Sequence, residues 1–264
     1  MNPTSLVILP AGEYFAEITA KIGRAKAGER VALMAMSFDP SELVVASLVH
    51  EVIDAAQRGA QVQLNVDAHA FMIHDSQGMP NGPLLLGKNP RRTIYKTYRY
   101  KLKVLEQLAA SGGRYRITNL PRRSNLPIAG RSHIKYTVVN GTAYLGGCNL
   151  NGTDQIDFMV RLEDPKTADW IYNFMLQVAA SGSPKKLLNG QDVSLKIEPN
   201  TTLLVDAGRK SQSIIYDNAL KIIDDASERL VLTCQFFPGG AIAQHLAAAL
   251  ARGVDIKIYY SHIS

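Results

Sequence analysis

The strongest constraint on the fold is a repeat within the chain. Glu29–Leu33 is echoed by Glu228–Leu232, and Ala56–Val62 is echoed by Ala251–Ile256, at offsets of 199 and 194 residues. Around the first copy, alternating apolar and polar periods predict a helix, a strand, a second helix and a second strand. This order is typical of a layered α/β domain. Because only one partial second copy is present, the repeat excludes a solenoid and favours two similar α/β halves.

The same periods place the elements along the 264-residue chain. Helices are expected over Glu13–Lys26, Ser41–Arg58, Thr93–Ala110 and Pro165–Ala180, and strands over Val31–Met36, Val62–Asp67, Tyr115–Thr118, Ile134–Val139, Thr142–Leu145 and Ile156–Leu162. Residues 70–92 carry six Gly and Pro residues and are expected to form a long surface loop.

The repeat also predicts how the chain is divided. Residues 1–181 are expected to form a first half, 182–210 a connection, and 211–264 the start of a second half. The second copy stops directly after its second strand. We therefore expect this chain to be a fragment or one part of a split polypeptide.

One short segment carries residues suited to phosphodiester chemistry. On a strand, His133 and Lys135 share a face and project into the same pocket. The imidazole can attack phosphorus, while the ammonium binds a phosphate oxygen as a point charge. Further along, Gly146 and Gly147 let the backbone approach a ligand closely, and the amide of Asn149 can donate to a phosphate oxygen.

These residues resemble the H-x-K-x4-D-x6-G-S-x-N signature of the phospholipase D superfamily, especially its cardiolipin-synthase-like branch. The resemblance implies a layered α-β-α fold, with a mixed sheet flanked by helices and here a partial second repeat. It implies two H-x-K motifs, one from each half, in cis or from another chain. One histidine forms a phosphohistidine, and the other protonates the leaving alcohol. The resemblance implies no metal and no cofactor.

The segment departs from that signature at two positions. Asn140 stands where the signature has Asp. With five residues instead of six between Asn140 and Gly146, Gly147 stands where the signature has Ser. Asn140 and Gly141 suit the type I′ turn of a hairpin, so Asn140 is expected to support that hairpin. Asp157 lies near the superfamily's downstream acidic position and could orient an imidazole.

The formal net charge of +6 favours anionic partners. Arg131 and Arg123 lie close to the motif and are expected to steer phosphate. Two cysteines cannot form a four-ligand metal site.

A second group, His69 and His74 with Asp67 and Asp75, invites a metal-site interpretation. Its spacing crosses a loop, so a mobile loop near the mouth of the site is favoured instead.

The leading hypothesis is a phospholipase D-like phosphodiesterase or phosphatidyltransferase acting on phospholipids. The alternatives are a nuclease of the same superfamily and a non-catalytic phosphate- or lipid-binding relative. No apolar run approaches the ~20 residues of a membrane span, and the N-terminus lacks the pattern of a signal peptide. We therefore expect a cytoplasmic protein, or one in peripheral contact with a membrane.

Overall fold

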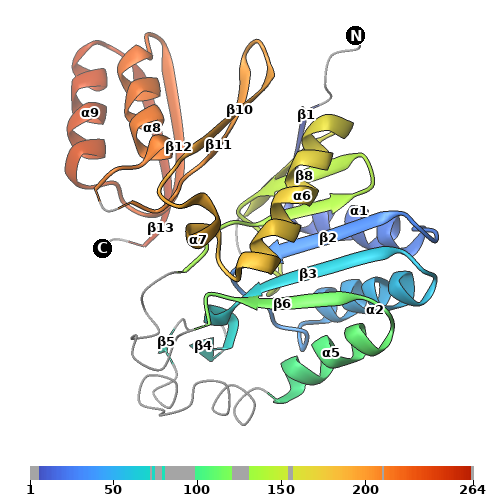
Figure 1. Ribbon diagram of the computed structural model, residues 1–264. Helices are drawn as coiled ribbons and strands as arrows, with labels where there is room; N and C mark the ends of the chain where they lie inside the picture. Colours follow the sequence, from blue (N-terminus) through green and yellow to red (C-terminus); the bar gives the residue numbers. More distant parts are fainter. Residues whose placement is uncertain are drawn as a thin grey trace. The chain divides into compact units, whose positions relative to one another are not determined.

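The computed structural model describes residues 6–71, 73–74, 79–80, 99–120, 131–153, 157–209 and 211–262. They fall into two compact units, Met1–Leu187 and Leu188–Ser264, and Figure 1 colours the chain from blue to red along its length. The stretch 182–210, predicted as a connection, contains a short helix and a two-stranded hairpin.

A seven-stranded mixed sheet forms the middle layer of the first unit (Figure 1). Its strands are β1 (Leu6–Pro10), β2 (Arg30–Ala35), β3 (Gln61–Asp67), β6 (Arg114–Thr118), β7 (Tyr136–Val139), β8 (Thr142–Gly146) and β9 (Phe158–Leu162). Their spatial order is β1-β9-β8-β7-β2-β3-β6.

The strand directions bring several strand ends to one edge of this sheet. β2, β3 and β6 are parallel, whereas the pairs β2–β7, β7–β8, β8–β9 and β9–β1 are antiparallel. The carboxyl ends of β2, β3, β6 and β8 therefore meet the amino ends of β7 and β9. We call this the motif edge, which is marked by Ala35, Asp67, Thr118, Gly146, Tyr136 and Phe158.

Helices cover both faces of the sheet. α1 (Ala11–Gly23), α2 (Leu43–Gln57) and α5 (Arg99–Ala110) lie on one face, and α6 (Pro165–Ser181) lies on the other (Figure 1). The predicted layered α-β-α arrangement, with a mixed sheet flanked by helices, is confirmed. The first residues of the predicted helix 93–110, residues 93–98, lie outside the described part of the chain.

Strand β3 alternates apolar and polar residues as predicted, yet both of its faces are buried. Its apolar residues join the core beneath α1, α2 and α5. On the other face, Gln63 Nε2 donates to Asn65 Oδ1 at 2.8 Å, and Asn65 Nδ2 donates to the backbone oxygen of Met175 in α6, also at 2.8 Å. The polar row is thus paired with α6 instead of with water.

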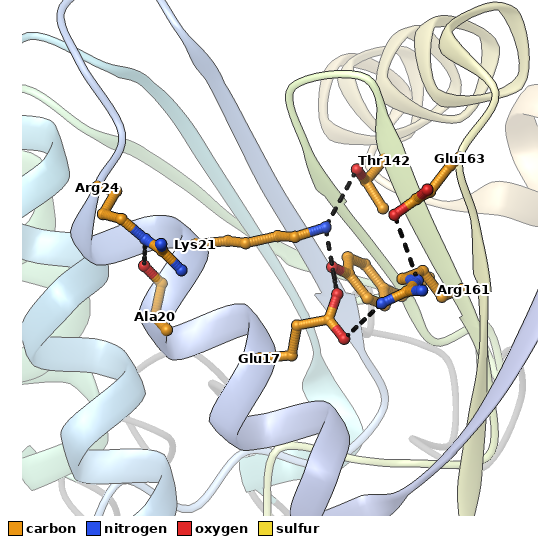
Figure 2. Close-up of polar contacts among 8 residues, drawn as sticks. Glu17, Ala20, Lys21, Arg24, Thr142, Arg161 and Glu163 are labelled. Atoms are coloured by element: carbon orange, nitrogen blue, oxygen red, sulfur yellow. Dashed lines mark hydrogen bonds and ion pairs between the residues drawn. The ribbon is translucent and has the colours of Figure 1, made fainter. Parts of the chain in front are cut away.

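A polar cluster fixes α1 to β8 and β9 (Figure 2). Glu17 accepts hydrogen bonds from the Tyr144 hydroxyl at 2.7 Å and from Arg161 Nη1 at 2.9 Å. Lys21 Nζ lies 3.2 Å from Glu17 Oε1 and donates to Thr142 Oγ1 at 3.3 Å. Thr142 begins β8, at the end opposite the motif edge, so this cluster belongs to the framework of the sheet.

The second unit repeats the element order of the first. It contains α8 (Ile214–Asp225), β12 (Arg229–Phe236), α9 (Gly240–Ala251) and β13 (Asp255–His262), with β12 parallel to β13. This is the order of α1, β2, α2 and β3, as the sequence repeat predicts. Preceding it are α7 (Pro184–Leu188) and the antiparallel strands β10 (Val193–Glu198) and β11 (Thr201–Val205).

Strand β1 and the β10–β11 hairpin were not predicted, and one predicted loop differs from the structure. The predicted loop 70–92 begins instead inside a buried 3₁₀ helix, η1 (Ala68–Phe71). It continues with β4 (Ile73–His74) paired to β5 (Met79–Pro80), and its remaining residues lie outside the description.

In the described part of the chain, no helix has the length and apolar character needed to cross a membrane.

Candidate active site

Most of the predicted site residues come together at the motif edge. Ligands of open α/β sheets bind outside the carboxyl ends of the strands, which is where this edge lies. The residues gathered there are Ser37 after β2, Asp67 and His69 at the end of β3, Asn119 after β6, His133 and Lys135 before β7, Asn149 after β8, and Asp157 before β9.

His133 and Lys135 contact each other directly. Lys135 Nζ lies 3.0 Å from His133 Nδ1 and donates to the His133 backbone oxygen at 2.9 Å. Lys135 is buried, at 5% exposure, whereas His133 is exposed. The prediction that they lie on a strand is wrong, because β7 begins at Tyr136. Their side chains nevertheless point to one place.

Burial lowers the pKa of both groups. Burial lowers the pKa of Lys135 to about 8, against the attraction of Asp157, Cys148 and Asp67. Partial burial, followed by the charges of Lys135 and Arg131, lowers the pKa of His133. The His133 ring is therefore neutral at pH 7. An ammonium donating to Nδ1 places the ring proton on Nε2.

The carboxylate of Asp67 ties two segments of the site together. Its Oδ1 accepts from the backbone N–H of His69 at 2.8 Å. Its Oδ2 accepts from Asn119 Nδ2 at 2.6 Å and from the backbone N–H of Ser132 at 2.9 Å. Since Ser132 precedes His133, Asp67 positions the start of the motif. Sequence reasoning considered Asp67 only as a metal ligand and missed this role.

His69 is buried at the same place, which corrects the expectation of a mobile loop. Its residue is 5% exposed, and its Nδ1 has no hydrogen-bond partner among the described residues. Burial, followed by the charges of Arg131, His133 and Lys135, lowers the pKa of His69 to about 4. The described residues contain no group of three or more His, Cys, Asp or Glu side chains arranged for a metal ion. The side chain of His74 and all of Asp75 lie outside the description.

The amide of Asn149 is held from one side. Its Oδ1 accepts from the backbone N–H of Ser37, in the loop after β2, at 3.1 Å. A backbone N–H requires an acceptor, so this contact fixes which end of the amide faces Ser37. The Nδ2 group is then the end that can donate to a bound molecule, as predicted for a phosphate oxygen.

The two glycines before Asn149 are required by the neighbouring strand. A Cβ atom at Gly146 would meet the backbone oxygen of Phe158 and would lie 2.9 Å from the Cα of Met159. A Cβ atom at Gly147 would overlap Oδ1 of Asp157. We predicted that these glycines admit a ligand, and the structure adds that they admit β9 and Asp157.

Asp157 lies beside the ammonium of Lys135. Burial raises the pKa of Asp157, and the charge of Lys135 opposes that rise. No hydrogen bond joins Asp157 to His133 in the described part of the site, so its carboxylate acts here on Lys135.

Comparison with known proteins supports the fold. No family model and no curated protein matches the sequence. Among solved structures, phosphatidylserine synthase from Haemophilus influenzae Rd KW20 matches 97% of this chain and 61% of its own, with 14% identity and a TM-score of 0.65. The chain has the phospholipase D fold.

Two further solved structures match the chain less well. Polyphosphate kinase from Porphyromonas gingivalis matches 99% of this chain and 38% of its own, with 13% identity and a TM-score of 0.55. Nuc from Salmonella typhimurium, a phospholipase D family member, matches 68% of this chain and 94% of its own, with 20% identity and a TM-score of 0.43. The chain thus spans less than two thirds of the synthase and of the kinase.

Three predicted site residues remain to be placed in this phospholipase D-like fold, namely Asn140, Arg131 and Arg123. Asn140 lies at the end of β7 opposite His133, where its N–H donates to the Arg30 backbone oxygen at 2.8 Å and its Oδ1 accepts from the Arg30 N–H at 3.0 Å. Asn140 takes a positive φ of 53°, whereas Gly141 does not, so the turn is not type I′ at both positions. Arg131 is exposed next to Ser132, and Arg123 lies outside the described residues.

Proposed function

We propose that this chain carries one half-site of a phospholipase D-type phosphodiesterase or phosphatidyltransferase. In this proposal, His133 is the nucleophile that forms a phosphohistidine, and Lys135 and Asn149 bind the phosphoryl oxygens. The substrate class is a phospholipid, as in the cardiolipin-synthase-like branch. A second H-x-K motif, in cis or from another chain, supplies the second histidine.

The observation that carries the proposal is the contact between Lys135 and His133. It joins an exposed imidazole to a buried cation at 3.0 Å, at the edge of the sheet where ligands of such folds bind. The match to a phosphatidylserine synthase over 97% of this chain supports a lipid phosphodiester as the substrate class.

The contact also defines what must change when substrate binds. Attack by Nε2 requires a free electron pair there, so the ring proton must sit on Nδ1. The Lys135 ammonium, which donates to Nδ1 and to the His133 backbone oxygen, must then turn toward the phosphoryl oxygens. An anionic phosphate favours that movement because it attracts the ammonium more strongly than a neutral ring does.

The proposed reaction then balances in two displacements. The Nε2–P bond forms as the bond from phosphorus to the leaving oxygen breaks, and the leaving oxygen takes a proton from the second histidine. Water or an acceptor alcohol next gives a proton to that histidine and attacks phosphorus. His133 leaves and is restored.

The nucleophile can be tested without the second half. Bis(p-nitrophenyl) phosphate releases a stable phenolate, so its departure needs no proton from a second histidine. The full chain is incubated with this diester and digested at neutral pH, and mass spectrometry locates the adduct. A phosphoryl adduct on His133 is expected in the wild type and in His50→Ala, and none in His133→Ala.

The substrate class is tested with two arms in parallel. The full chain is offered two p-nitrophenyl esters, one of phosphatidic acid in vesicles and one of thymidine 5′-phosphate, and the same adduct is sought. Both release p-nitrophenolate, so neither needs the second histidine. An adduct from the lipid ester supports the proposal, whereas an adduct from the nucleotide ester alone would assign a nuclease. Absence of any adduct on His133 with all three substrates would favour a non-catalytic phosphate-binding protein.

A further inference from the structure

His69 is a buried imidazole that the proposed chemistry does not use. It lies in η1, directly after β3, and only 5% of its surface is exposed. The backbone N–H of His69 is held by Asp67 at 2.8 Å, but its ring Nδ1 has no partner among the described residues. A buried polar atom left unpaired destabilises the folded state, so the fold gains nothing from this nitrogen.

The position of His69 is coupled to that of the H-x-K segment. One carboxylate, that of Asp67, accepts from the N–H of His69 and from the N–H of Ser132, the residue before His133. The carboxyl end of β3 and the amino end of β7 lie at the motif edge, on either side of β2. His69 and His133 are therefore held at one place by a shared anchor.

Three basic side chains lie near His69. Arg131, His133 and Lys135 lie close enough for their charges to lower the pKa of His69, after burial, to about 4. The carboxylate of Asp67 is occupied by three donors. From α5, Lys101 Nζ donates to the backbone oxygen of Ala70 at 3.0 Å, which also holds η1 in place.

We propose that His69 is a second imidazole of the H-x-K site and hydrogen-bonds the phosphoryl group that His133 and Lys135 bind. This inference rests on the proposed function, because it assigns the ligand of the same site. A neutral imidazole can donate one N–H to a phosphoryl oxygen, and an anion beside it favours the charged ring. The first half then brings two histidines to one phosphate.

The test measures each histidine separately in the full chain. Histidine ring signals are followed by NMR across pH, with and without sulfate, at matched ionic strength. Sulfate is a tetrahedral anion whose charge does not change in this pH range. The pKa of His69 is expected to rise from about 4 without sulfate to about 5 or above with it. By linkage, this equals at least about a tenfold preference of the anion for the charged ring.

Internal controls and variants separate the two proposals. The ring signals of His50, exposed on α2, and of His245, in the second unit, should not respond to sulfate. If His133 responds and His69 does not, His69 has no role at the site while the proposed function stands. If neither responds, the anion site itself is refuted, and the proposed function fails with it.

A second measurement asks whether His69 contributes to binding. Sulfate affinity is compared between His69→Gln, which keeps a hydrogen-bond donor, and His69→Leu, which keeps only volume. We expect His69→Leu to bind sulfate at least about tenfold more weakly than His69→Gln. Equal affinities in two folded variants would overturn the contact, whatever the response of His133.

Discussion

The carboxylate of Asp67 accepts a hydrogen bond from the backbone N–H of Ser132 at 2.9 Å, across 65 residues of sequence. This contact joins the end of β3 to the segment that carries His133. The position of the His133 imidazole therefore depends on Asp67, which acts through the backbone of the neighbouring Ser132.

Replacing Asp67 by Asn should loosen the H-x-K segment. The carboxylate receives three N–H donors, and an amide placed there turns its own NH₂ group toward at least one of them. We expect hydrogen exchange to accelerate by about tenfold or more at the amide of Ser132 or of His69, whichever faces the NH₂ group. Asp54→Asn, on the outer helix α2, is the matched control. Unchanged protection of both amides in Asp67→Asn would show that Asp67 does not hold the motif.

A Cβ atom at Gly146 should be poorly tolerated, because the atoms that it would meet belong to the backbone of Phe158 and Met159. Gly146→Ala is expected to lower the free energy of unfolding by at least about 2 kcal/mol, measured by urea denaturation. Gly12→Ala is the control, since no described atom lies within 4 Å of a Cβ there. That change should be neutral or slightly stabilising. Similar losses in both variants would contradict the close approach of β9.

Placing a serine at Gly147, as in the phospholipase D signature, should displace Asp157. The added Cβ would overlap Oδ1 of Asp157, while the φ of Gly147 is not positive and suits any residue. Gly147→Ser is expected to cost at least about 1 kcal/mol less stability in an Asp157→Ala background than in the wild type. A double-mutant cycle in urea measures this coupling, and strictly additive costs would argue against it.

The repeat and the periodicity were sufficient to predict the layers of the fold. The order α1, β2, α2, β3 and its recurrence as α8, β12, α9, β13 follow from local patterns that each helix or strand carries in its own sequence. Strand β1 was missed because its five residues form a short, mostly apolar run, and periodicity alone does not assign such a run to a strand or to a helix.

The site was predicted only where its residues are close in sequence. His133, Lys135 and Asn149 lie within one segment, so their spacing is visible. Asp67 and His69 reach the same edge through the sheet order, which places β3 beside β2 and β2 beside β7. A short polar side chain at the carboxyl end of a buried strand was the available signal, and the glycines and prolines that follow it suggested a loop instead.

The amide of Asn149 can be divided into a structural end and a ligand-binding end. Asn149→Asp keeps an acceptor for the N–H of Ser37 and replaces the outward donor by a carboxylate oxygen. The free energy of unfolding should stay within about 1 kcal/mol of the wild type, while sulfate affinity, measured by calorimetry, falls at least about tenfold. Asn173→Asp, exposed on α6, makes the same change in charge and should leave the affinity unchanged. Retained binding by Asn149→Asp would exclude the amide as an anion donor.

The buried ammonium of Lys135 should make the stability depend on pH in the alkaline range. Its pKa is about 8 in the folded protein, against an ordinary value of 10.5. Below pH 8 the group is charged in both states and adds no pH dependence. Between pH 8 and 10 the folded protein has released this proton while the unfolded chain keeps it. The contribution of Lys135 to the free energy of unfolding therefore rises with pH, by up to about 1.4 kcal/mol per unit.

Comparison with Lys135→Met isolates this contribution from that of other groups. Urea denaturation of both proteins at pH 7, 8, 9 and 10 gives the difference in their free energies of unfolding. We expect this difference to be flat from pH 7 to 8 and then to move in favour of the wild type, because only the wild type can relieve a buried charge by losing its proton. The same series with Lys103→Met, exposed on α5, should show no such change. A flat difference for Lys135→Met across the whole range would mean that the ammonium is not held away from water.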